Sequence, residues 1–516
     1  MPQKSRPHLS VFVGLVLITP WISPLAFGPS PAVVSWLVSL GCAGLAFQLS
    51  HFYKDDTAKV AARAWLIAAL VSSVIGLIQY FGYSTAFLPW VNATQAGEAF
   101  GNLRQRNQFA TLTNIGMASV LYFVGRRSTS APKTILTSWP IAAVILLAAA
   151  NASSSSRTGM IQLPVIAAML VMWGRFEAAF EGKLIALAIA VYCAAILALP
   201  SLLGLDPSSY GILARLHEGP ACLSRIVLWN NVLHLIAQRP WLGWGWGELD
   251  YAHFITLYPG PRFCDILDNA HNLPLHFAVE LGIPVALLAC GSGAWLMWKN
   301  KPWMETKPAR QLAWLVLALI LLHSLLEYPL WYGPFQIAVA LCSLIIWSSR
   351  TDTQTGVSDA ANTLANIGLP PSRLGKFVTG CVSAVLLVGV SYAAWDYHRI
   401  SQIYLPPNAR SSAYREDTLE KIRPSWLFRN QVKFAELTTT EVTATNAAQV
   451  NALAKEMLHF SPEARVAEKL IESAVVLERD DEALYYLARY RAAFPNEHAR
   501  WAATMRLPAE PSASAK

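Results

Sequence analysis

The stretch that decides the fold lies near the middle of the chain, where polar residues 202–284 interrupt a series of apolar runs. It ends in Asp268-Asn-Ala-His-Asn-Leu-Pro-Leu-His-Phe-Ala-Val-Glu-Leu-Gly-Ile-Pro284. Proline is favoured in the first turn of a helix, so Pro274 and Gly282 predict a short helix after His271. Ordering so long a loop costs conformational entropy, which predicts that the loop does more than connect two hydrophobic segments.

Two further patterns lie in the same stretch. From Ser224 to Gln238, apolar side chains recur at helical spacing with polar ones between them, which predicts an amphipathic helix at the membrane interface. Arg225 is in its first turn, where a cation opposes the helix dipole and needs an anionic partner, either a lipid head group or a substrate. The sequence Trp241-Leu-Gly-Trp-Gly-Trp-Gly247 lacks the preceding strand of a nucleotide-binding motif, so its glycines predict a turn.

The rest of the chain has the composition of a membrane protein. Of its 516 residues, 54% are hydrophobic and 14% are charged, whereas soluble proteins carry about 25% charged residues. We therefore predict an all-α, polytopic membrane protein of about 11–12 transmembrane helices. Apolar runs of suitable length occur near residues 9–27, 31–50, 61–81, 108–124, 138–151, 159–173, 184–200, 283–298, 311–326, 334–348 and 377–395.

The distribution of lysine and arginine predicts the topology. Basic clusters before the first run and after every second run fall on one side, which is therefore cytoplasmic. The loops at 83–107, 152–158, 200–274 and 327–333 then face the periplasm or exterior. The net charge of +8 follows from this bias, and no nucleic-acid partner is expected.

The last part of the chain differs in kind from the membrane part. It is charged, and residues 465–500 have helical periodicity with a break at Phe494-Pro495, which predicts a helical hairpin with degenerate tetratricopeptide-like packing. The predicted domains are a membrane domain of residues 1–395 and an external, periplasmic helical domain of residues 396–516. The final residues, 507–516, are rich in proline, serine and alanine and are expected to be disordered.

The cysteines separate by location. Five lie within apolar runs and are expected to pack as small hydrophobic side chains. Cys222 and Cys264 both lie in the polar loop. If that loop is periplasmic, these two can form a disulfide.

Arginines on the external side oppose the positive-inside bias, so each needs a reason. Arg157 follows four serines and precedes Thr158 and Gly159 at the edge of two short apolar runs. Its guanidinium would lie near the membrane surface, and guanidinium pairs bidentately with phosphate, which suits a lipid diphosphate. For the other external arginines the simpler reading is contact with lipid phosphate. These are Arg104, Arg106, Arg215, Arg239 and Arg262.

His271 is the candidate base. Its place beside a helix N-terminus disfavours the imidazolium and favours anions nearby, so a neutral imidazole could take a proton from an acceptor hydroxyl. The alternatives are an ordinary surface histidine, or His276 within the helix as the functional one. Asp265 and Asp268 lack a third ligand at suitable spacing, so no metal is expected.

Taken together, the motifs resemble the bacterial O-antigen ligase superfamily, and most closely its PglL-type protein O-oligosaccharyltransferases, which glycosylate pilin. The similarity covers roughly residues 90–350. It is carried by Gly101-Asn-Leu-Arg-Gln-Arg-Asn107, Ser156-Arg157-Thr-Gly159, Arg225 with Trp229, Arg239-Pro-Trp-Leu-Gly-Trp-Gly-Trp-Gly247, Ala270-His271-Asn272 with Glu280-Leu-Gly282, and Glu327-Tyr-Pro329.

The resemblance implies a reaction and roles for residues. The expected activity is the metal-independent, cofactor-free and inverting transfer of an oligosaccharide from undecaprenyl pyrophosphate, in the bacterial inner membrane on its periplasmic face. The acceptor would be a Ser or Thr hydroxyl of pilin or another periplasmic protein. His271 would activate that hydroxyl, and Arg157 and Arg225 would hold the pyrophosphate.

The resemblance also implies an acceptor or glycan site. Its residues would be Gln105, Asn107, Glu327 and Tyr328. The family motif around the glutamine usually reads Gly-Asn-x-Asn-Gln-Pro-Asn, and here arginines replace the second asparagine and the proline. The role of Gln105 is therefore less firmly implied than that of His271.

Two other functions remain open at this level. A related enzyme ligates O-antigen to lipid A core or polymerises repeat units, and a transporter could move the same lipid-linked sugar. A transporter should carry polar residues or broken helices near the membrane midplane, often in paired halves. The polar residues here are expected to gather at one face, which favours an enzyme. The tail, the Gln105 stretch and Tyr328 favour a protein acceptor.

Overall fold

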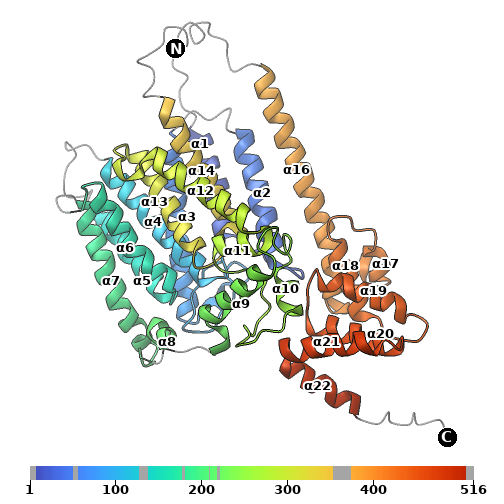
Figure 1. The fold of residues 1–516 in the computed structure, drawn as a ribbon. Coiled ribbons are helices and arrows are strands. Elements are labelled where there is room, and N and C mark those ends of the chain that lie inside the picture. Colours follow the sequence, from blue (N-terminus) through green and yellow to red (C-terminus); the bar gives the residue numbers. More distant parts are fainter. Residues whose placement is uncertain are drawn as a thin grey trace. The chain divides into compact units, whose positions relative to one another are not determined.

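The structure is a computed structural model in which every regular element is a helix. It describes residues 7–49, 56–126, 138–176, 180–208, 210–217, 221–351 and 373–506, and none of these forms a strand (Figure 1). The prediction of an all-α chain is therefore confirmed. The predicted disordered end, residues 507–516, lies outside the described residues.

The chain forms two compact units, each built from two separate parts of the sequence. The first contains Met1–Glu218 and Ala294–Trp395, and the second contains Gly219–Gly293 and Asp396–Lys516. The polar loop thus packs with the tail. The predicted domains, 1–395 and 396–516, divide the chain by membrane topology instead of by compactness, and that division stays a prediction.

The first unit contains most of the apolar helices. They are α1 (Pro7–Ile22), α2 (Pro31–Leu49), α3 (Thr57–Tyr80), α4 (Arg106–Gly125), α5 (Ser138–Ser153), α6 (Arg157–Met172), α7 (Phe180–Leu202), the short α8 (Gly211–His217), α13 (Pro308–Ser324) and α14 (Gly333–Thr351). Helices α12 (Ile283–Asn300) and α16 (Arg373–Ser401) each extend across the division between the units.

Several of these helices have the length and composition of membrane spans. Within the described residues, four apolar segments are long enough to cross a membrane: Ala32–Leu49, Thr57–Tyr80, Phe180–Leu202 and Gly380–Tyr404. Five shorter apolar helices accompany them: His8–Ile22, Ser138–Ser153, Arg157–Met172, Pro308–Ser324 and Gly333–Ser348. These findings fit a helical membrane protein, and the count of 11–12 spans stays a prediction.

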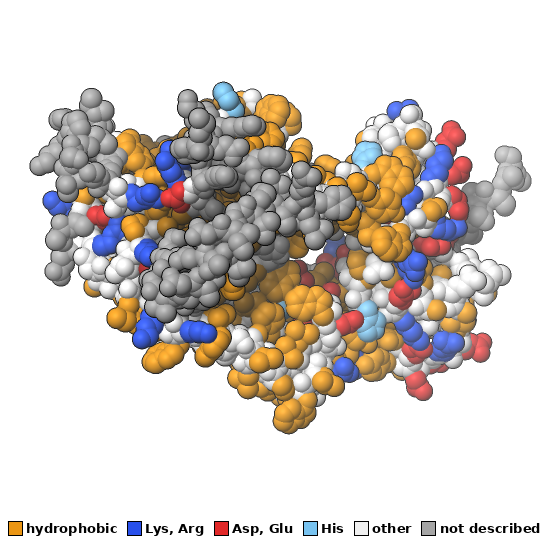
Figure 2. Space-filling view, turned by 90° about the horizontal axis from the view of Figure 1, so that it is seen from above, with side chains coloured by type: hydrophobic (Ala, Val, Ile, Leu, Met, Phe, Trp, Pro, Cys, Tyr) orange, Lys and Arg blue, Asp and Glu red, His pale blue; other side chains and the backbone are white. Residues whose placement is uncertain are grey.

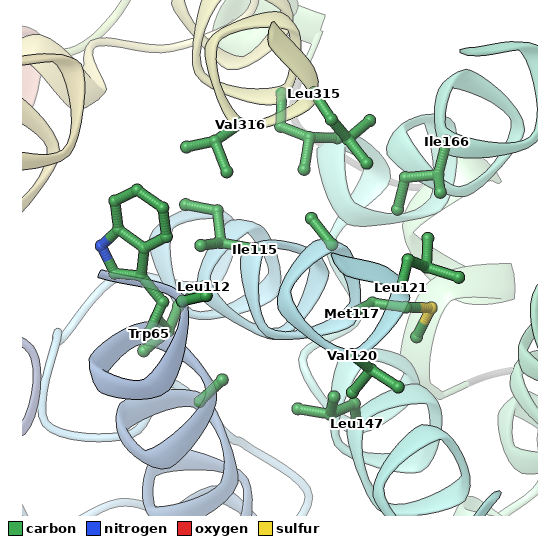
Figure 3. Packing of buried hydrophobic residues seen from close by; sticks show 14 of the residues in the cluster. Trp65, Leu112, Ile115, Met117, Val120, Leu121, Leu147, Ile166, Leu315 and Val316 are labelled. Carbon is green, nitrogen blue, oxygen red and sulfur yellow. The ribbon is translucent and has the colours of Figure 1, made fainter. Parts of the chain in front are cut away.

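Helix α4 is the centre of the first unit. It contacts α3, α5, α6 and α13, and every residue from Gln108 to Tyr122 is buried. Figure 3 shows Ile115 and Met117 of α4 among hydrophobic side chains from neighbouring helices. At Gly116 a Cβ would overlap Ala69 of α3, so glycine permits the close approach of these two helices.

The second unit combines the polar loop with the C-terminal helices. The loop forms α9 (Arg225–Gln238), α10 (Leu249–Ile255) and α11 (Leu273–Leu281), and the tail forms α17 (Thr418–Ile422), α18 (Arg429–Thr439), α19 (Ala447–Leu458), α20 (Ala464–Val476), α21 (Asp480–Ala493) and α22 (Pro495–Arg506). The helical hairpin predicted at 465–500 is present as α20 and α21. Charged side chains of both signs are dense over the C-terminal helices (Figure 2).

Helix α10 holds the loop and the tail together. Phe254 of α10 is buried in the core of the C-terminal helices, and Arg489 Nε of α21 donates a hydrogen bond of 2.8 Å to the carbonyl of Ile255. The ring of Tyr251 stacks on His459, with 3.8 Å between centroids. The segment that carries His271 is thus part of the same compact unit as the tail.

Candidate active site

His271 lies in a strained turn directly before α11. Asn272 caps the helix by accepting a hydrogen bond of 3.1 Å from the Leu275 amide, and Pro274 lies in the first turn, as predicted. The backbone of His271 has φ of 50°, and its amide donates to Asn269 Oδ1 at 2.9 Å. A non-glycine residue in this left-handed region costs on the order of 1–3 kcal/mol, and such strain is concentrated at functional sites.

Backbone strain recurs at other predicted site segments. Among the described residues, positive φ occurs at six non-glycine positions. Three of them are His271, Ser155, which is two residues before Arg157, and Arg104, which precedes Gln105. The motifs therefore coincide with places where the surrounding structure holds the chain in an unfavourable conformation.

The aromatic-glycine turn supports the end of α11. The amides of Trp244 and Gly245 donate hydrogen bonds of 2.9 Å each to the carbonyls of Val279 and Glu280. A Cβ at Gly243 would overlap the Glu280 carbonyl, and Gly243 has φ of 69°. The glycines thus form a turn, as predicted, and the turn satisfies carbonyls that a helix end leaves without intrahelical partners.

Helix α9 carries Arg225 and packs on α11. Ser224 caps it by accepting a hydrogen bond of 3.2 Å from the Val227 amide, so Arg225 is its first residue and is half-buried. One turn later, Trp229 Nε1 donates a hydrogen bond of 3.1 Å to the carbonyl of Ala270, beside His271. The two predicted site segments are therefore joined directly within this unit.

The buried side of α9 includes one of its asparagines. Asn231 is buried, donating to the Pro261 carbonyl at 3.0 Å and accepting from the Phe263 amide at 2.8 Å. Ile226 and Leu233 are exposed. Leu228 and Val232 pack against the loop that carries α9, a contact that helical periodicity does not reveal.

A disulfide closes the loop around α9. Cys222 and Cys264 are bonded, with 5.5 Å between their Cα atoms and 42 residues of sequence separation. The bond joins the segment just before Arg225 to the segment just before His271. It therefore restricts the polar loop at the place where the site residues lie.

His276, the competing histidine, is buried within α11. Its Nε2 lies 3.4 Å from a carboxylate oxygen of Glu280, and both side chains are nearly inaccessible. Burial lowers the pKa of His276 to about 4, and His271 adds to this effect. Burial raises the pKa of Glu280 to about 7, although the backbone amides of Gly247 and Leu249 act to lower it. Glu280 thus pairs with His276, which leaves the half-buried His271 as the accessible candidate.

Arg157 is the exposed first residue of α6, in the first unit. Ser156 caps α6 by accepting a hydrogen bond of 3.0 Å from the Gly159 amide. The Arg157 guanidinium donates to the carbonyl of Arg215 in α8, and Arg215 Nη1 donates to the Ser155 carbonyl at 2.9 Å. Because the N-terminus of a helix carries partial positive charge, an arginine there favours a bound anion.

Gln105 and Tyr328 lie on the wall of one cavity of about 300 Å³. Gln105 caps α4, and its Oε1 accepts a hydrogen bond of 2.7 Å from the Gln108 amide. Tyr328 stacks on Tyr332, with 6.0 Å between centroids. Asn102 and Arg104 complete a polar and aromatic lining. The first unit thus brings together two site residues that are far apart in the sequence.

Asn107 and Glu327 form a second pair in the first unit. Asn107 Nδ2 donates a hydrogen bond of 3.0 Å to Glu327 Oε1, and Asn107 Oδ1 accepts one of 2.6 Å from the Ser156 hydroxyl. Neither residue lines the cavity of Gln105 and Tyr328. The resemblance implied one site for all four residues, and in the structure Asn107 and Glu327 point toward the start of α6.

A buried polar network inside the bundle was missed by sequence reasoning. Gln162 Nε2 donates to Thr111 Oγ1 at 3.0 Å, and Thr111 Oγ1 lies 3.0 Å from His323 Nδ1. Asn114 Nδ2 donates to Gln162 Oε1 at 2.9 Å, and Asn151 Nδ2 donates to Asn114 Oδ1 at 3.0 Å. The available signal was Thr111 and Asn114 three residues apart in an apolar helix.

No candidate metal centre accompanies these residues. In the ranges that the structure describes, no three His, Cys, Asp or Glu side chains are grouped so as to hold a metal ion.

Three protein families match successive parts of the chain. The family described as protein glycosylation ligase matches residues 99–123. The O-antigen ligase family matches residues 142–290, which include Arg157, Arg225 and His271. A third family, described as the C-terminal part of virulence factor membrane-bound polymerases, matches residues 311–507.

Two curated proteins of Acinetobacter baylyi are similar to the chain. A general O-oligosaccharyltransferase is 24% identical over 347 residues, which cover 64% of this chain and 57% of that protein. A ComP-specific O-oligosaccharyltransferase is 25% identical over 332 residues, which cover 63% of this chain and 56% of that protein. The matched region therefore spans somewhat more than half the length of these relatives. The resemblance drawn from the motifs is confirmed: the chain is similar to the O-antigen ligases and the bacterial O-oligosaccharyltransferases, and these matches support a glycosyltransferase.

Proposed function

We propose that the chain transfers an oligosaccharide en bloc from undecaprenyl pyrophosphate to a Ser or Thr hydroxyl of a periplasmic protein such as pilin. The reaction takes place at the periplasmic face of the bacterial inner membrane, inverts the anomeric centre and needs no metal or cofactor. The observation that supports this most is the setting of His271, in a strained turn that Trp229 of α9 supports through its hydrogen bond to the preceding residue. The similarity to O-oligosaccharyltransferases supports a protein acceptor.

In this proposal His271 acts as the general base. The acceptor oxygen attacks the anomeric carbon and forms the new glycosidic bond while the bond from that carbon to the phosphate oxygen breaks. His271 takes the hydroxyl proton, and undecaprenyl pyrophosphate leaves with the bonding electrons. Histidine is the side chain that most often serves as a general base in such proton transfers.

Arg157 and Arg225 bind the pyrophosphate. Both are first residues of helices, so each guanidinium adds to the positive end of a helix dipole. Negative charge grows on the leaving pyrophosphate, and fixed guanidinium groups stabilise it without reorganising. Gln105 and Tyr328 belong to the acceptor or glycan site, because their cavity offers amide groups and aromatic rings to a sugar or a peptide.

A second function is favoured by one observation. Residues 311–507 match the C-terminal part of virulence factor membrane-bound polymerases, so the chain could instead join repeat units or ligate O-antigen to lipid A core. The donor chemistry would be the same, and only the acceptor hydroxyl would differ.

One experiment that identifies the acceptor distinguishes between these functions. The chain is expressed with a pilin and a lipid-linked glycan pathway in a host without its own ligase, and glycan is measured on protein, on lipid A core and as free polymer. We expect glycan on pilin, with none when His271 is replaced by alanine. Glycan on lipid A core, or longer polymer, would establish the alternative.

A further inference from the structure

The start of α6 is held by a chain of side-chain hydrogen bonds from two other helices. Ser156 is fully buried. Its hydroxyl oxygen accepts from the Gly159 amide at 3.0 Å, and its proton is donated to Asn107 Oδ1 at 2.6 Å. Because a hydroxyl has a single proton, Asn107 determines the orientation in which Ser156 caps the helix.

Glu327 in turn orients Asn107. A carboxylate accepts hydrogen bonds and cannot donate them, so the Asn107 amide must present its nitrogen to Glu327 and its oxygen to Ser156. Glu327 is itself held at the end of α13, where its amide donates to the His323 carbonyl at 2.8 Å. It is largely buried, with 9% of its surface exposed.

The first turn of α6 is also held from its other sides. At Gly159 a Cβ would overlap Asn151 and Ala110, so α4 and α5 approach the helix closely there. Asn114 Nδ2 donates to the Gly159 carbonyl at 3.1 Å. Since Arg157 lies between Ser156 and Gly159, the place from which its guanidinium projects depends on these contacts.

We propose that Glu327 and Asn107 are positioning residues for Arg157, acting through Ser156 and not by contact with glycan or acceptor. The proposal separates them from Gln105 and Tyr328, whose cavity they do not line. It rests on the proposed function only in assigning Arg157 to the donor pyrophosphate.

Exchanging the amide of Asn107 and the carboxylate of Glu327 tests this series of hydrogen bonds directly. In Asn107→Asp two carboxyl groups face each other, and at a pH where both are ionised their repulsion should raise the KM for lipid-linked donor about tenfold, with little change in the KM for acceptor. Glu327→Gln should stay near wild type, because the Gln carbonyl can accept the same bond. In Asn107→Asp with Glu327→Gln, the Gln amide donates to one Asp oxygen and Ser156 donates to the other, so the donor KM should recover.

Ser156→Ala is a second test that adds no charge. It removes both the helix cap on the Gly159 amide and the hydrogen bond to Asn107. The KM for lipid-linked donor should therefore rise as in Asn107→Asp. Ser119→Ala is the matched control, since Ser119 is a buried serine of α4 whose hydroxyl donates to the Ile115 carbonyl at 3.0 Å. It should leave the donor KM unchanged.

Hydrogen exchange provides a readout that does not need the reaction. The amides of Gly159 and Met160, which donate to Ser156, should exchange about tenfold faster in Asn107→Asp and Ser156→Ala. They should exchange at the wild-type rate in the double variant and in Ser119→Ala. If the wild-type protein transfers no glycan but the variants show this exchange pattern, the proposed function is overturned. The positioning of Arg157 by Glu327 and Asn107 would still stand. Loss of activity in Glu327→Gln without recovery in the double variant, or unchanged exchange, would overturn the positioning role.

Discussion

The indole Nε1 of Trp229 donates a hydrogen bond of 3.1 Å to the carbonyl of Ala270, the residue before His271. Trp229 is one turn beyond Arg225 on α9, so this single bond links the helix of a candidate phosphate-binding arginine to the turn of the candidate base. The backbone of His271 is strained, with φ of 50°, and needs such external support.

Loss of the Trp229 bond should lower catalysis without unfolding the protein. Trp229→Phe keeps an aromatic ring but leaves the Ala270 carbonyl without its donor, so we expect kcat for glycan transfer to fall about tenfold. Trp426→Phe is a suitable control, because Trp426 lies between α17 and α18 and is 70% exposed. Wild-type turnover in Trp229→Phe would show that the indole bond does not position His271.

Replacement of His271 should separate activity from stability. Asparagine tolerates a left-handed backbone better than most residues, so His271→Asn should fold and insert normally. It lacks a base of suitable pKa, and transfer should fall by about 10²–10⁴-fold. Glycan transfer is compared with the thermal unfolding midpoint of the purified protein in detergent. A variant that keeps full activity would exclude the role of general base.

Arginine at position 157 should not be replaceable by lysine. Lysine keeps the positive charge, but its ammonium lacks the planar fork that pairs bidentately with a diphosphate. We expect Arg157→Lys to raise the KM for lipid-linked donor while the KM for acceptor changes little. The measurement uses membranes with matched amounts of protein, and an unchanged donor KM would argue against bidentate binding.

The disulfide should stabilise the second unit. Cys222 and Cys264 are separated by 42 residues, and cross-linking a loop of this size stabilises a protein by about 4 kcal/mol in the chain-entropy model. We expect the double replacement by serine to lower the free energy of unfolding in detergent by that order. The same loss should follow reduction of the wild type, and reductant should have no effect on the double variant.

The pair of His276 and Glu280 predicts how stability depends on pH. The pKa of Glu280 is raised from 4.5 to about 7, so the folded state binds more protons there and stability falls as pH rises through that window. The pKa of His276 is lowered from 6.5 to about 4, so stability rises with pH over its window. The two effects oppose each other between these limits.

Replacing either His276 or Glu280 should reveal the pH dependence of stability that the remaining residue causes. In Glu280→Gln only the His276 effect remains. The thermal unfolding midpoint should therefore increase as the pH is raised from 4 to 6.5 and then level off. In His276→Gln it should instead fall as the pH rises from 4.5 toward 7. Parallel pH profiles for wild type and both variants would show that this pair does not titrate as described.

Local features of the site could be predicted from the sequence. Ser224, Pro274 and Gly282 marked ends of α9 and α11, and the structure places those ends where predicted. The two loop cysteines, far from the other five, made a disulfide possible, and it is present. Caps and turns depend on a few consecutive residues, so they can be read without knowing which helices pack together.

Only the tertiary structure decided which site residues meet. Gln105 joins Tyr328 at one cavity, whereas Asn107 and Glu327 hold the start of α6. The family resemblance had implied a single site for all four. The sequence by itself determined the helical class, the apolar character of the bundle and the local turn that carries His271, because periodicity and capping are short-range. The packing of distant helices, which depends on side-chain shape at every contact, determined the partners of each polar group.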